Sequence, residues 1–494
     1  MTAPGPPWQR LDPRMLLVHP VHELARQLPL LIGSAAVGSA TGSPLWVPAA
    51  VVLTLLLGVA RWFTTTYRIG PDEVQLRTGV LYRKSISVPR NRIRSVSTEA
   101  RLLHRLLGLA VLRVGTGQEA KGADEFELDA VPAEQVPRLR AELLTESLAG
   151  LPDEPDPGRV LARWEPSWLR YSLVSLTGLA TIAVVAAMAA QLGAGELLRD
   201  SAAARAGLDA AQRLGVAAAV SVAAVVVLVA GVLLNLGRGL LGYGNLVLRR
   251  DAEVLHLQHG LVRERTRTFD MRRWRGGSLR EPLLVRALGG ARLDAVMTGV
   301  DGTGEASLLL PPCPAPTATA VLAELTGDPA VAGGPLRRHP AAATRRRFTR
   351  ALAAPVVALP ALIWAGGAVP GWVWPAWAVL TGCCLLLALD RARSLGHRVG
   401  DGWLVTRAGS LERRRHCIAA AGVIGWTVRQ TFWQRRAGVA TLVAATAAGV
   451  KHYEVVDVPA EQAWAIAAAV SPWLADTAWA RPAPGPGCAA ATAV

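Results

Sequence analysis

Long apolar runs are the feature that most constrains what this chain can fold into. A helix that crosses the roughly 30 Å hydrocarbon core of a bilayer needs about 17–25 mostly apolar residues. Six runs of this kind occur in three pairs: LARQLPLLIGSAAVGSA with PLWVPAAVVLTLLLGVARWF, WLRYSLVSLTGLATIAVVAAMAAQL with LGVAAAVSVAAVVVLVAGVLLNL, and ALAAPVVALPALIWAGGAV with GWVWPAWAVLTGCCLLLAL. Because 51% of the residues are hydrophobic and only 18% are charged, we predict an integral membrane protein. The first run is short and weakly apolar, so a buried or re-entrant hairpin is the alternative there.

Basic residues and tryptophans predict how the runs lie in the membrane. Lys and Arg concentrate on the cytoplasmic side of membrane helices. Arginines flank the outer ends of each pair, whereas the turns TGS and PG within two of the pairs carry no charge. We therefore expect both termini and all three large polar segments to be cytoplasmic. Tryptophans near the ends of the runs fit an interfacial aromatic belt: Trp46, Trp62, Trp164, Trp168, Trp364, Trp372 and Trp374.

The polar segment after each pair repeats one phrase. RLLGLAVL, RALGGARL and RRAGVATL share an Arg, a Gly three residues later, and then Ala and Leu at alternate positions. In every copy another glycine stands 29 residues before the glycine of the phrase. Identical spacing without gaps indicates duplication. The Arg and the Gly are interpreted as structural residues that finish a short helical turn before a strand begins; they are Arg105, Gly108, Arg286, Gly289, Arg435 and Gly438.

Each polar segment has the pattern of a small β domain. Apolar residues alternate with polar ones in YRIGPDEVQLRTGVLYRKSISVPRNRIRSVSTE, which is typical of antiparallel strands with one buried face. The segment ends in PAEQVPRLRAELL, an amphipathic helix opened by Pro132. Short strands followed by one helix predict a barrel capped by a C-terminal helix, because closure removes free strand edges. In the second copy MRRWRGGSL stands in place of PRNRIRSVS.

These motifs carry a resemblance to a known family. LYRKSISVPRNRIRSVSTEARLLHRLLGLAVLRVGTG resembles the core of bacterial pleckstrin-homology-like (PH-like) domains. QRRAGVATLVAATAAGVKHYEVVDVP and LLVHPVHELARQLPLL are similar to parts of the YdbS/YdbT family of membrane proteins. The resemblance implies a mixed membrane α and all-β fold, in which six transmembrane helices form three pairs. Each pair is followed by a cytoplasmic PH-like antiparallel β-barrel with a C-terminal helix. It also implies a bacterial cell membrane, no catalytic residues, and a partner such as a shorter PH-like membrane protein of the YdbS type.

The predicted organisation divides the chain into ten segments. They are a cytoplasmic lead-in (1–23), transmembrane pair 1 (24–63), PH-like domain 1 (64–148), a linker (149–167), transmembrane pair 2 (168–236), PH-like domain 2 (237–327), a basic linker (328–350), transmembrane pair 3 (351–389), PH-like domain 3 (390–475) and a disordered tail (476–494).

The sequence lacks the common motifs of catalysis and cofactor binding. The five cysteines form no C-x-x-C pair, and no Walker loop, G-x-S-x-G or H-E-x-x-H motif occurs. GVDGTGEAS is interpreted as a hairpin turn, and HPVHE as an interfacial lead-in rather than a metal site. The middles of the second to sixth runs contain no Asp, Glu, Lys or Arg, which argues against an ion-coupled transporter. We expect no enzyme, no cofactor and no metal.

Arginine clusters are the candidate contacts with anionic lipid or a protein partner. The net charge is +16, and an Arg close to an anionic membrane surface contributes about 1 kcal/mol. Specific headgroup binding, diffuse attraction to the membrane and plain solvated strand faces all remain open. Nucleic-acid binding is not expected, since the arginines lie on short strands and loops rather than on a groove-reading helix. The candidates are Arg83, Lys84, Arg90, Arg92, Arg94, Arg272, Arg273, Arg413, Arg414 and Arg415.

The functional hypothesis is a non-enzymatic integral membrane scaffold. It would present three PH-like domains at the inner leaflet for protein-partner or anionic-lipid interaction, with a role in envelope homeostasis or tolerance of membrane-active agents. The alternative is a transporter or lipid-handling membrane protein that uses the six spans as a path. The sequence leaves the ligand, the physiological process and the oligomeric state open.

Overall fold

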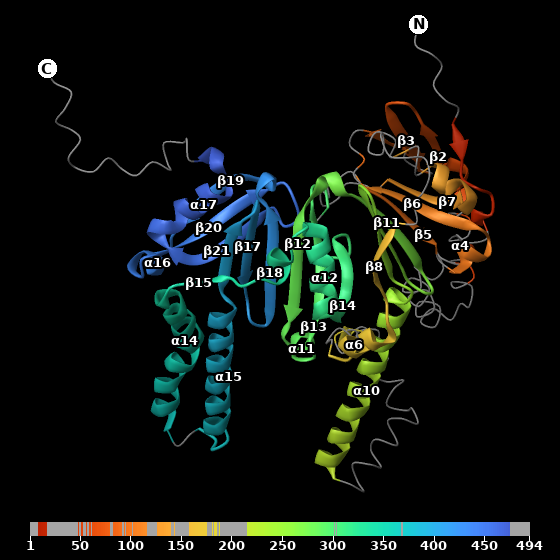
Figure 1. The fold of residues 1–494 in the computed structure, drawn as a ribbon. Helices are drawn as coiled ribbons and strands as arrows, with labels where there is room; N and C mark the ends of the chain where they lie inside the picture. Colours follow the sequence, from red (N-terminus) through yellow and green to blue (C-terminus); the bar gives the residue numbers. More distant parts are fainter. Residues whose placement is uncertain are drawn as a thin grey trace, which may run out of the picture. The chain divides into compact units, whose positions relative to one another are not determined.

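A computed structural model gives the fold as a mixture of helices and antiparallel sheets (Figure 1). The chain falls into two compact units, Met1–Trp164 with Gly239–Arg272, and Glu165–Arg238 with Arg273–Val494. The residues that the structure describes are 8–16, 48, 51–52, 56, 59–60, 62–79, 83–90, 93, 95–100, 102–115, 126–139, 143, 158–174, 180, 182–184, 187, 215–300, 302, 304–366 and 369–474.

The threefold repeat is visible in the order of the elements. Copy one contains β1 (Gln9–Arg10), β2 (Thr66–Ile69), β3 (Glu73–Thr78), β4 (Lys84–Pro89), β5 (Ser95–Ala100), α4 (Leu102–Leu106), β6 (Leu109–Gly115), β7 (Phe126–Pro132) and η2 (Ala133–Gln135). Copy two contains β8 (Arg159–Arg163), η3 (Pro166–Leu169), α6 (Arg170–Leu173), α10 (Val216–Tyr243), β9 (Val247–Asp251), β10 (Val254–His259), β11 (Glu264–Asp270), η4 (Met271–Arg273), β12 (Trp274–Pro282), α11 (Leu283–Ala287), β13 (Gly290–Met297), β14 (Leu308–Pro314) and α12 (Ala315–Thr326). Copy three contains α13 (Pro329–Gly333), β15 (Arg337–Arg338), α14 (Ala341–Ala365), α15 (Val373–Ser394), β16 (Gly396–Gly400), β17 (Trp403–Ala408), β18 (Glu412–Ala419), η6 (Ala420–Gly422), β19 (Val423–Arg429), α16 (Phe432–Arg436), β20 (Val439–Thr446), β21 (His452–Pro459), η7 (Ala460–Gln462), α17 (Ala463–Val470) and η8 (Pro472–Leu474).

The strands form four open sheets, which differs from the separate barrels that the sequence predicts. Their orders are β1-β2-β3-β4, β7-β6-β5-β11-β10-β9-β8, β14-β13-β12-β18-β17-β16-β15 and β19-β20-β21. The last three strands of one copy thus continue into the first four strands of the next, and no closed barrel occurs among the described strands. The physical reason is that β5 and β12 satisfy their outer backbone groups by pairing with β11 and β18 of the following copy.

The two joints between copies have the same register. Glu99 of β5 lies opposite Arg265 of β11, and Arg280 of β12, at the same repeat position as Glu99, lies opposite Arg414 of β18. At the second joint Gly276 has a φ of 141°, and a Cβ built there would collide with the backbone carbonyl of Cys417. A side chain is therefore excluded at this close approach of two strands.

A short strand precedes the apolar segments of each copy and pairs with the strand that follows them. β1 pairs with β2, β8 with β9, and β15 with β16. The apolar segments are thus inserted between two neighbouring strands. The sequence analysis places these three short strands in the lead-in and the linkers, because two to five residues are too few to show a period-two pattern.

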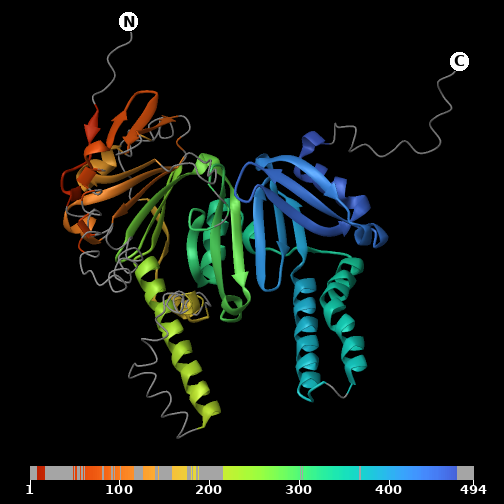
Figure 2. The same ribbon diagram turned by 180° about the vertical axis from the view of Figure 1, so that it is seen from behind.

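Three described helices are long and apolar enough to cross a membrane. They cover Ala224–Tyr243 within α10, all of α14 and all of α15. These correspond to the fourth, fifth and sixth predicted spans; the first three predicted spans lie largely outside the described residues. α14 and α15 lie side by side below β16, β17 and β18 when seen from behind (Figure 2). The indole N–H of Trp377 on α15 donates to the carbonyl of Pro355 on α14 at 3.1 Å.

The apolar cores of copies one and three are built from strands of two different sheets. In copy one a buried cluster joins Val74 and Leu76 of β3 to Leu112 of β6 and Leu128 of β7. In copy three Leu404 of β17 and Ile418 of β18 pack with Val455 of β21 and Ile466 of α17. The terminal helix α17 therefore covers the core, as the sequence predicts for the helix that ends each polar segment.

Candidate functional site: the bases of the membrane helices

The repeated Arg–Gly phrase forms the same joint in all three copies. Gly108, Gly289 and Gly438 have φ values of 68°, 74° and 66°, the left-handed conformation that ends a helix. Their N–H groups donate to the carbonyls of the motif arginines at 2.9–3.2 Å, the shortest being at Gly289. Each glycine carbonyl then accepts the N–H that begins the terminal helical segment of the copy. The glycine thus links the short helix to the end of its module.

The motif arginine of one copy contacts the next copy near the base of that copy's second apolar helix. Arg286 on α11 donates to Asp390, in the last turns of α15, at 2.8 Å. Arg105 on α4 donates to the carbonyl of Leu261, between β10 and β11, at 3.2 Å, and the N–H of Leu261 donates to Leu241 in the last turn of α10 at 3.0 Å. The two arginines are equivalent in the repeat, although one binds a carboxylate of the helix and the other a backbone carbonyl next to it.

Asp390 is the centre of a polar junction at the end of α15. Its two carboxylate oxygens accept from Arg286 at 2.8 Å and from Arg413 on β18 at 3.0 Å. Arg413 also forms an ion pair with Glu281 of β12, at 3.6 Å. Two copies and one membrane helix therefore meet at four alternating charges, which are partly buried and weakly screened.

A second junction fixes the beginning of α14. Asp457 of β21 is fully buried and has a left-handed φ of 58°. Its carboxylate accepts from Arg346, from Arg347 at 2.6 Å, and from the Gln434 amide of α16 at 2.8 Å. Two guanidinium groups at the start of an apolar helix thus share one buried carboxylate, which balances one of their two positive charges.

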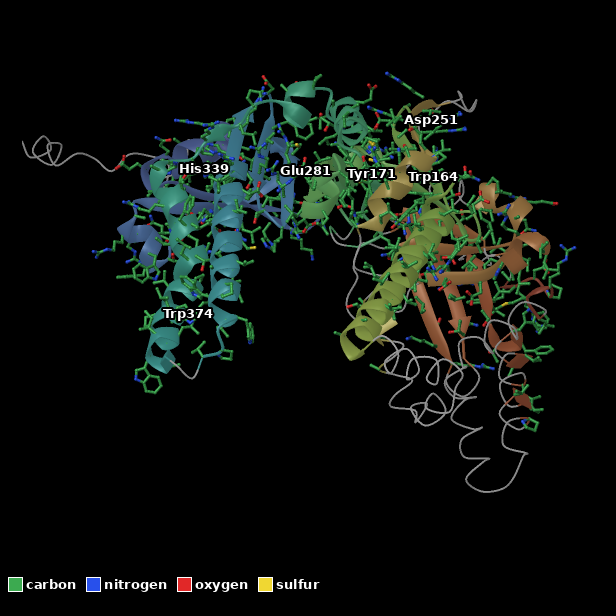
Figure 3. The ribbon with its side chains drawn as sticks, turned by 90° about the horizontal axis from the view of Figure 1, so that it is seen from below. Trp164, Tyr171, Asp251, Glu281, His339 and Trp374 are labelled. Carbon is green, nitrogen blue, oxygen red and sulfur yellow. The ribbon has the colours of Figure 1, made fainter. Side chains whose placement is uncertain are left out.

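Two histidines add a hydrogen-bonded chain beside this junction. His339 Nδ1 donates to the carbonyl of Val456 at 2.8 Å, and its Nε2 lies 2.9 Å from Nδ1 of His397 on β16. In this arrangement His397 donates and His339 accepts, which requires that the His339 ring be neutral. Burial lowers the pKa of His339, and burial with the neighbouring His339 and Arg337 lowers the pKa of His397 to about 4. Figure 3 shows His339 at the sheet end of the helix pair and Trp374 at its far tip.

The predicted lipid contacts occupy different surroundings. Arg83 and Lys84 are exposed at the start of β4, and Arg90 donates to the carbonyl of Pro71 at 3.2 Å. Arg272 and Arg273 lie in η4, and Arg272 donates to Asp270 at the end of β11. Arg414 donates to Glu412. Arg415 is 7% exposed and donates to the carbonyls of Val331 and Gly334. Arg92 and Arg94 lie outside the described residues.

An exposed apolar side chain, which the sequence analysis did not single out, stands two residues before each motif arginine. Leu103, Leu284 and Trp433 are 39%, 47% and 70% exposed. Leu284 lies on α11, whose Arg286 contacts the base of α15. Trp433 lies on α16, whose Gln434 contacts the Asp457 junction at the base of α14. The combination of Leu or Trp with a nearby Arg at a fixed repeat offset is the sequence signal that could have identified this position.

The two cysteines that lie in the sheets are buried. Burial raises the pKa of the Cys313 thiol to about 12 and that of Cys417 to about 11, so neither thiol is a nucleophile near neutral pH. Within the described parts of the chain, no cluster of three or more His, Cys, Asp or Glu could hold a metal ion. The HPVHE stretch is not among the described residues.

The fold and the junctions define a class of protein: tandem antiparallel modules joined to helices of membrane-spanning length. Residues 26–147 and 352–472 match the family model described as bacterial PH domain. The chain therefore carries bacterial PH-like domains in its first and third copies. The middle copy lies outside both matched regions, although it has the same order of strands and the same joints. Searches of curated proteins and of solved structures gave no match.

Proposed function

We propose that this protein is a non-enzymatic scaffold of the bacterial cell membrane that presents three PH-like modules at the inner leaflet. The observation that carries the proposal is that each motif arginine with a following copy donates a hydrogen bond to that copy, Arg105 to the Leu261 carbonyl and Arg286 to Asp390 of α15. Shared strand ladders and polar junctions hold module and helix together. A protein whose modules are fixed in this way is suited to present binding surfaces rather than to open a path.

The distribution of charge supports a cytoplasmic location of the modules. In α10, α14 and α15, Asp, Glu, Lys and Arg occur only near the end that adjoins the strands, among them Arg238, Arg350 and Arg391. At the opposite end of the α14–α15 pair stand the exposed Trp364, Trp372 and, at 39% exposure, Trp374. Arginine at one end and tryptophan at the other match the positive-inside rule and an interfacial aromatic belt.

The short helices α11 and α16 provide the contact with the membrane surface. Leu284 and Trp433 are exposed beside junctions that hold the bases of α15 and α14, where lipid headgroups surround the helices. Tryptophan favours this interfacial depth, and the exposed Arg435 would meet anionic headgroups there. The contact is a shallow one that orients the modules, and it requires no specific headgroup.

Depth-dependent quenching tests this contact. A fluorophore on Trp433→Cys, in the full chain in anionic nanodiscs with quenchers at headgroup depth, is expected to be quenched several-fold more than one on Asp401→Cys. Asp401 is the matched control, because β16 leaves the base of α15 and carries this exposed turn about 15 Å away. Equal quenching at the two positions would contradict the membrane contact.

Co-purification tests the scaffold role against the lipid-handling alternative. The full chain, extracted in mild detergent, is expected to retain a discrete protein partner, such as a shorter PH-like membrane protein, with bulk lipid only. A stoichiometric bound lipid without a protein partner would favour lipid handling along the spans. A role in envelope homeostasis or tolerance of membrane-active agents predicts a deletion strain that is more sensitive to such agents; unchanged sensitivity and membrane integrity would exclude it.

A further inference from the structure

The row of shared sheets ends in two strands that the described residues leave without a neighbour on one side. β5 and β12 each pair with the following copy, whereas their counterpart β19 is the outermost strand of the three-stranded sheet. β11 and β18 each pair with the preceding copy, whereas their counterpart β4 is the outermost strand of the first sheet. Within the chain, counterparts of β19 pair twice with counterparts of β4, as β5 with β11 and as β12 with β18. The two free edges are therefore of matching types.

The β19 edge is exposed where its counterpart is covered. Ser278 of β12 is 4% exposed, whereas Thr427, at the same repeat position on β19, is an exposed residue. The Arg280 side chain is 13% exposed and that of its counterpart Arg429 is 65% exposed. Ile424 of β19 is also 67% exposed. An open strand edge with an exposed Ile is a surface that proteins usually cover.

Residues of β4 are likewise exposed where their counterparts on β18 are buried. Arg415 of β18 is 7% exposed, whereas Ser85, its counterpart on β4, is exposed. Ser87 of β4 is likewise exposed, whereas its counterpart Cys417 is fully buried. β4 carries small and polar residues on this face, and these are compatible with the approach of another strand.

The third motif arginine provides an independent observation. Arg105 and Arg286 each donate to the following copy, to Leu261 and to Asp390, but Arg435 has no following copy. Its side chain is exposed and has no hydrogen-bond or ion-pair partner within the described part of the chain. Both the strand edge and the motif arginine of copy three therefore lack the contact that copies one and two make.

We propose that β19 binds β4 of a second copy of this chain, so that the row of modules continues head to tail from one molecule to the next. The internal register then places Arg429 opposite Lys84 and Thr427 opposite Ile86 of the second copy. The like charges of Arg429 and Lys84 repeat the opposition of Arg280 and Arg414 within the chain. Glu454 already neutralises Arg429 at 3.1 Å, as Asp294 does Arg280 at 2.9 Å.

Such a contact is heterologous, because one surface binds a different surface of the next molecule. Heterologous contacts form rings when the rotation between molecules closes and open rows when it does not. The inference rests on the proposed scaffold function and names its partner: a second copy that extends the scaffold in the plane of the membrane.

Cysteine cross-linking between two differently tagged full-length chains tests the register. In a cysteine-free background, Arg429→Cys in one chain and Lys84→Cys in the other are expected to give a disulfide-linked heterodimer in native membranes. Arg429→Cys with Asp401→Cys is the control, since Asp401 is exposed but lies on the β16–β17 turn. The control is expected to give at least tenfold less product.

The variant Thr427→Lys places a charge on the edge and opposite Ile86. We expect at least a tenfold loss of cross-linked product and a shift of the purified protein towards the monomer, with an unchanged melting temperature. Absence of the heterodimer, equal product in the control, or cross-linking of Arg429→Cys to a different protein would overturn the inference. A protein that passes the Trp433 quenching test yet remains a monomer would overturn this inference alone and leave the proposed function intact.

Discussion

At the scale of single residues, burial separates arginines that the sequence groups together. Arg346 and Arg347 belong to a basic segment whose position predicts the cytoplasmic side of a span, yet both are buried against Asp457. More than a hundred residues separate the acid from the arginines, so no local pattern shows this pairing. No local pattern shows the surroundings of Arg415 either, because it donates to the carbonyl of Val331 on α13. The sequence predicts where positive charge gathers, and tertiary packing decides which charges remain exposed.

The Asp457 junction leads to a prediction about stability. Asp457→Asn keeps a residue that tolerates the left-handed backbone but leaves two guanidinium groups without a counter-charge. Breaking a buried pair in this way costs about 3–5 kcal/mol. We expect a strongly lowered melting temperature of the full chain in detergent. Asp401→Asn, at an exposed position that also has positive φ, should change it little; equal effects would contradict the junction.

The His339–His397 chain makes the stability of the protein depend on pH. The folded pKa of His397, about 4, lies below the ordinary value of 6.5, so the unfolded chain binds more protons between these values. This stabilising contribution is complete above pH 6.5 and is lost as the pH falls towards 4. From pH 7.5 to pH 5 we expect a loss of about 2 kcal/mol. Thermal unfolding of His397→Gln should show a smaller pH slope than wild type; an unchanged slope would refute the assignment.

At the scale of elements, alternation in the sequence predicts the strands of each polar segment but not their neighbours. The described strands β3 and β4 coincide with the alternating residues, and the repeated glycines coincide with the ends of α4, α11 and α16. Pairing of β5 with β11 and of β12 with β18 could not be predicted, because period-two patterning specifies which face is buried and not which strand lies alongside. The short strands β8 and β15 carry too little pattern to be recognised.

Gly276 tests the shared sheet at its closest point. Gly276→Ala adds a Cβ that collides with the carbonyl of Cys417, at a φ that only glycine adopts readily. We expect a destabilisation of about 1–3 kcal/mol in thermal or chemical unfolding. Gly425, the counterpart in β19, has no atom within 4 Å of the added Cβ. Gly425→Ala should therefore be nearly neutral for the fold, and equal losses at both glycines would speak against the β12–β18 pairing.

At the scale of the whole molecule, the threefold repeat is the part of the architecture that the sequence predicts best. The order of strands in the three copies agrees with it, and PH-like regions match in copies one and three. The continuation of each sheet into the next copy changes how the repeats are understood, because neighbouring copies share a sheet rather than forming independent domains on a common anchor. Such a connection depends on long-range pairing, which no single repeat encodes.

Disulfide cross-linking of Thr98→Cys with Thr266→Cys tests the central claim most directly. These residues lie opposite each other across the β5–β11 joint between copies one and two. In a cysteine-free full-length chain in native membranes, we predict that this pair forms a disulfide as readily as Arg68→Cys with Gln75→Cys, which lie opposite each other within copy one. Cross-linking of the control pair alone would contradict a shared sheet and favour separate modules.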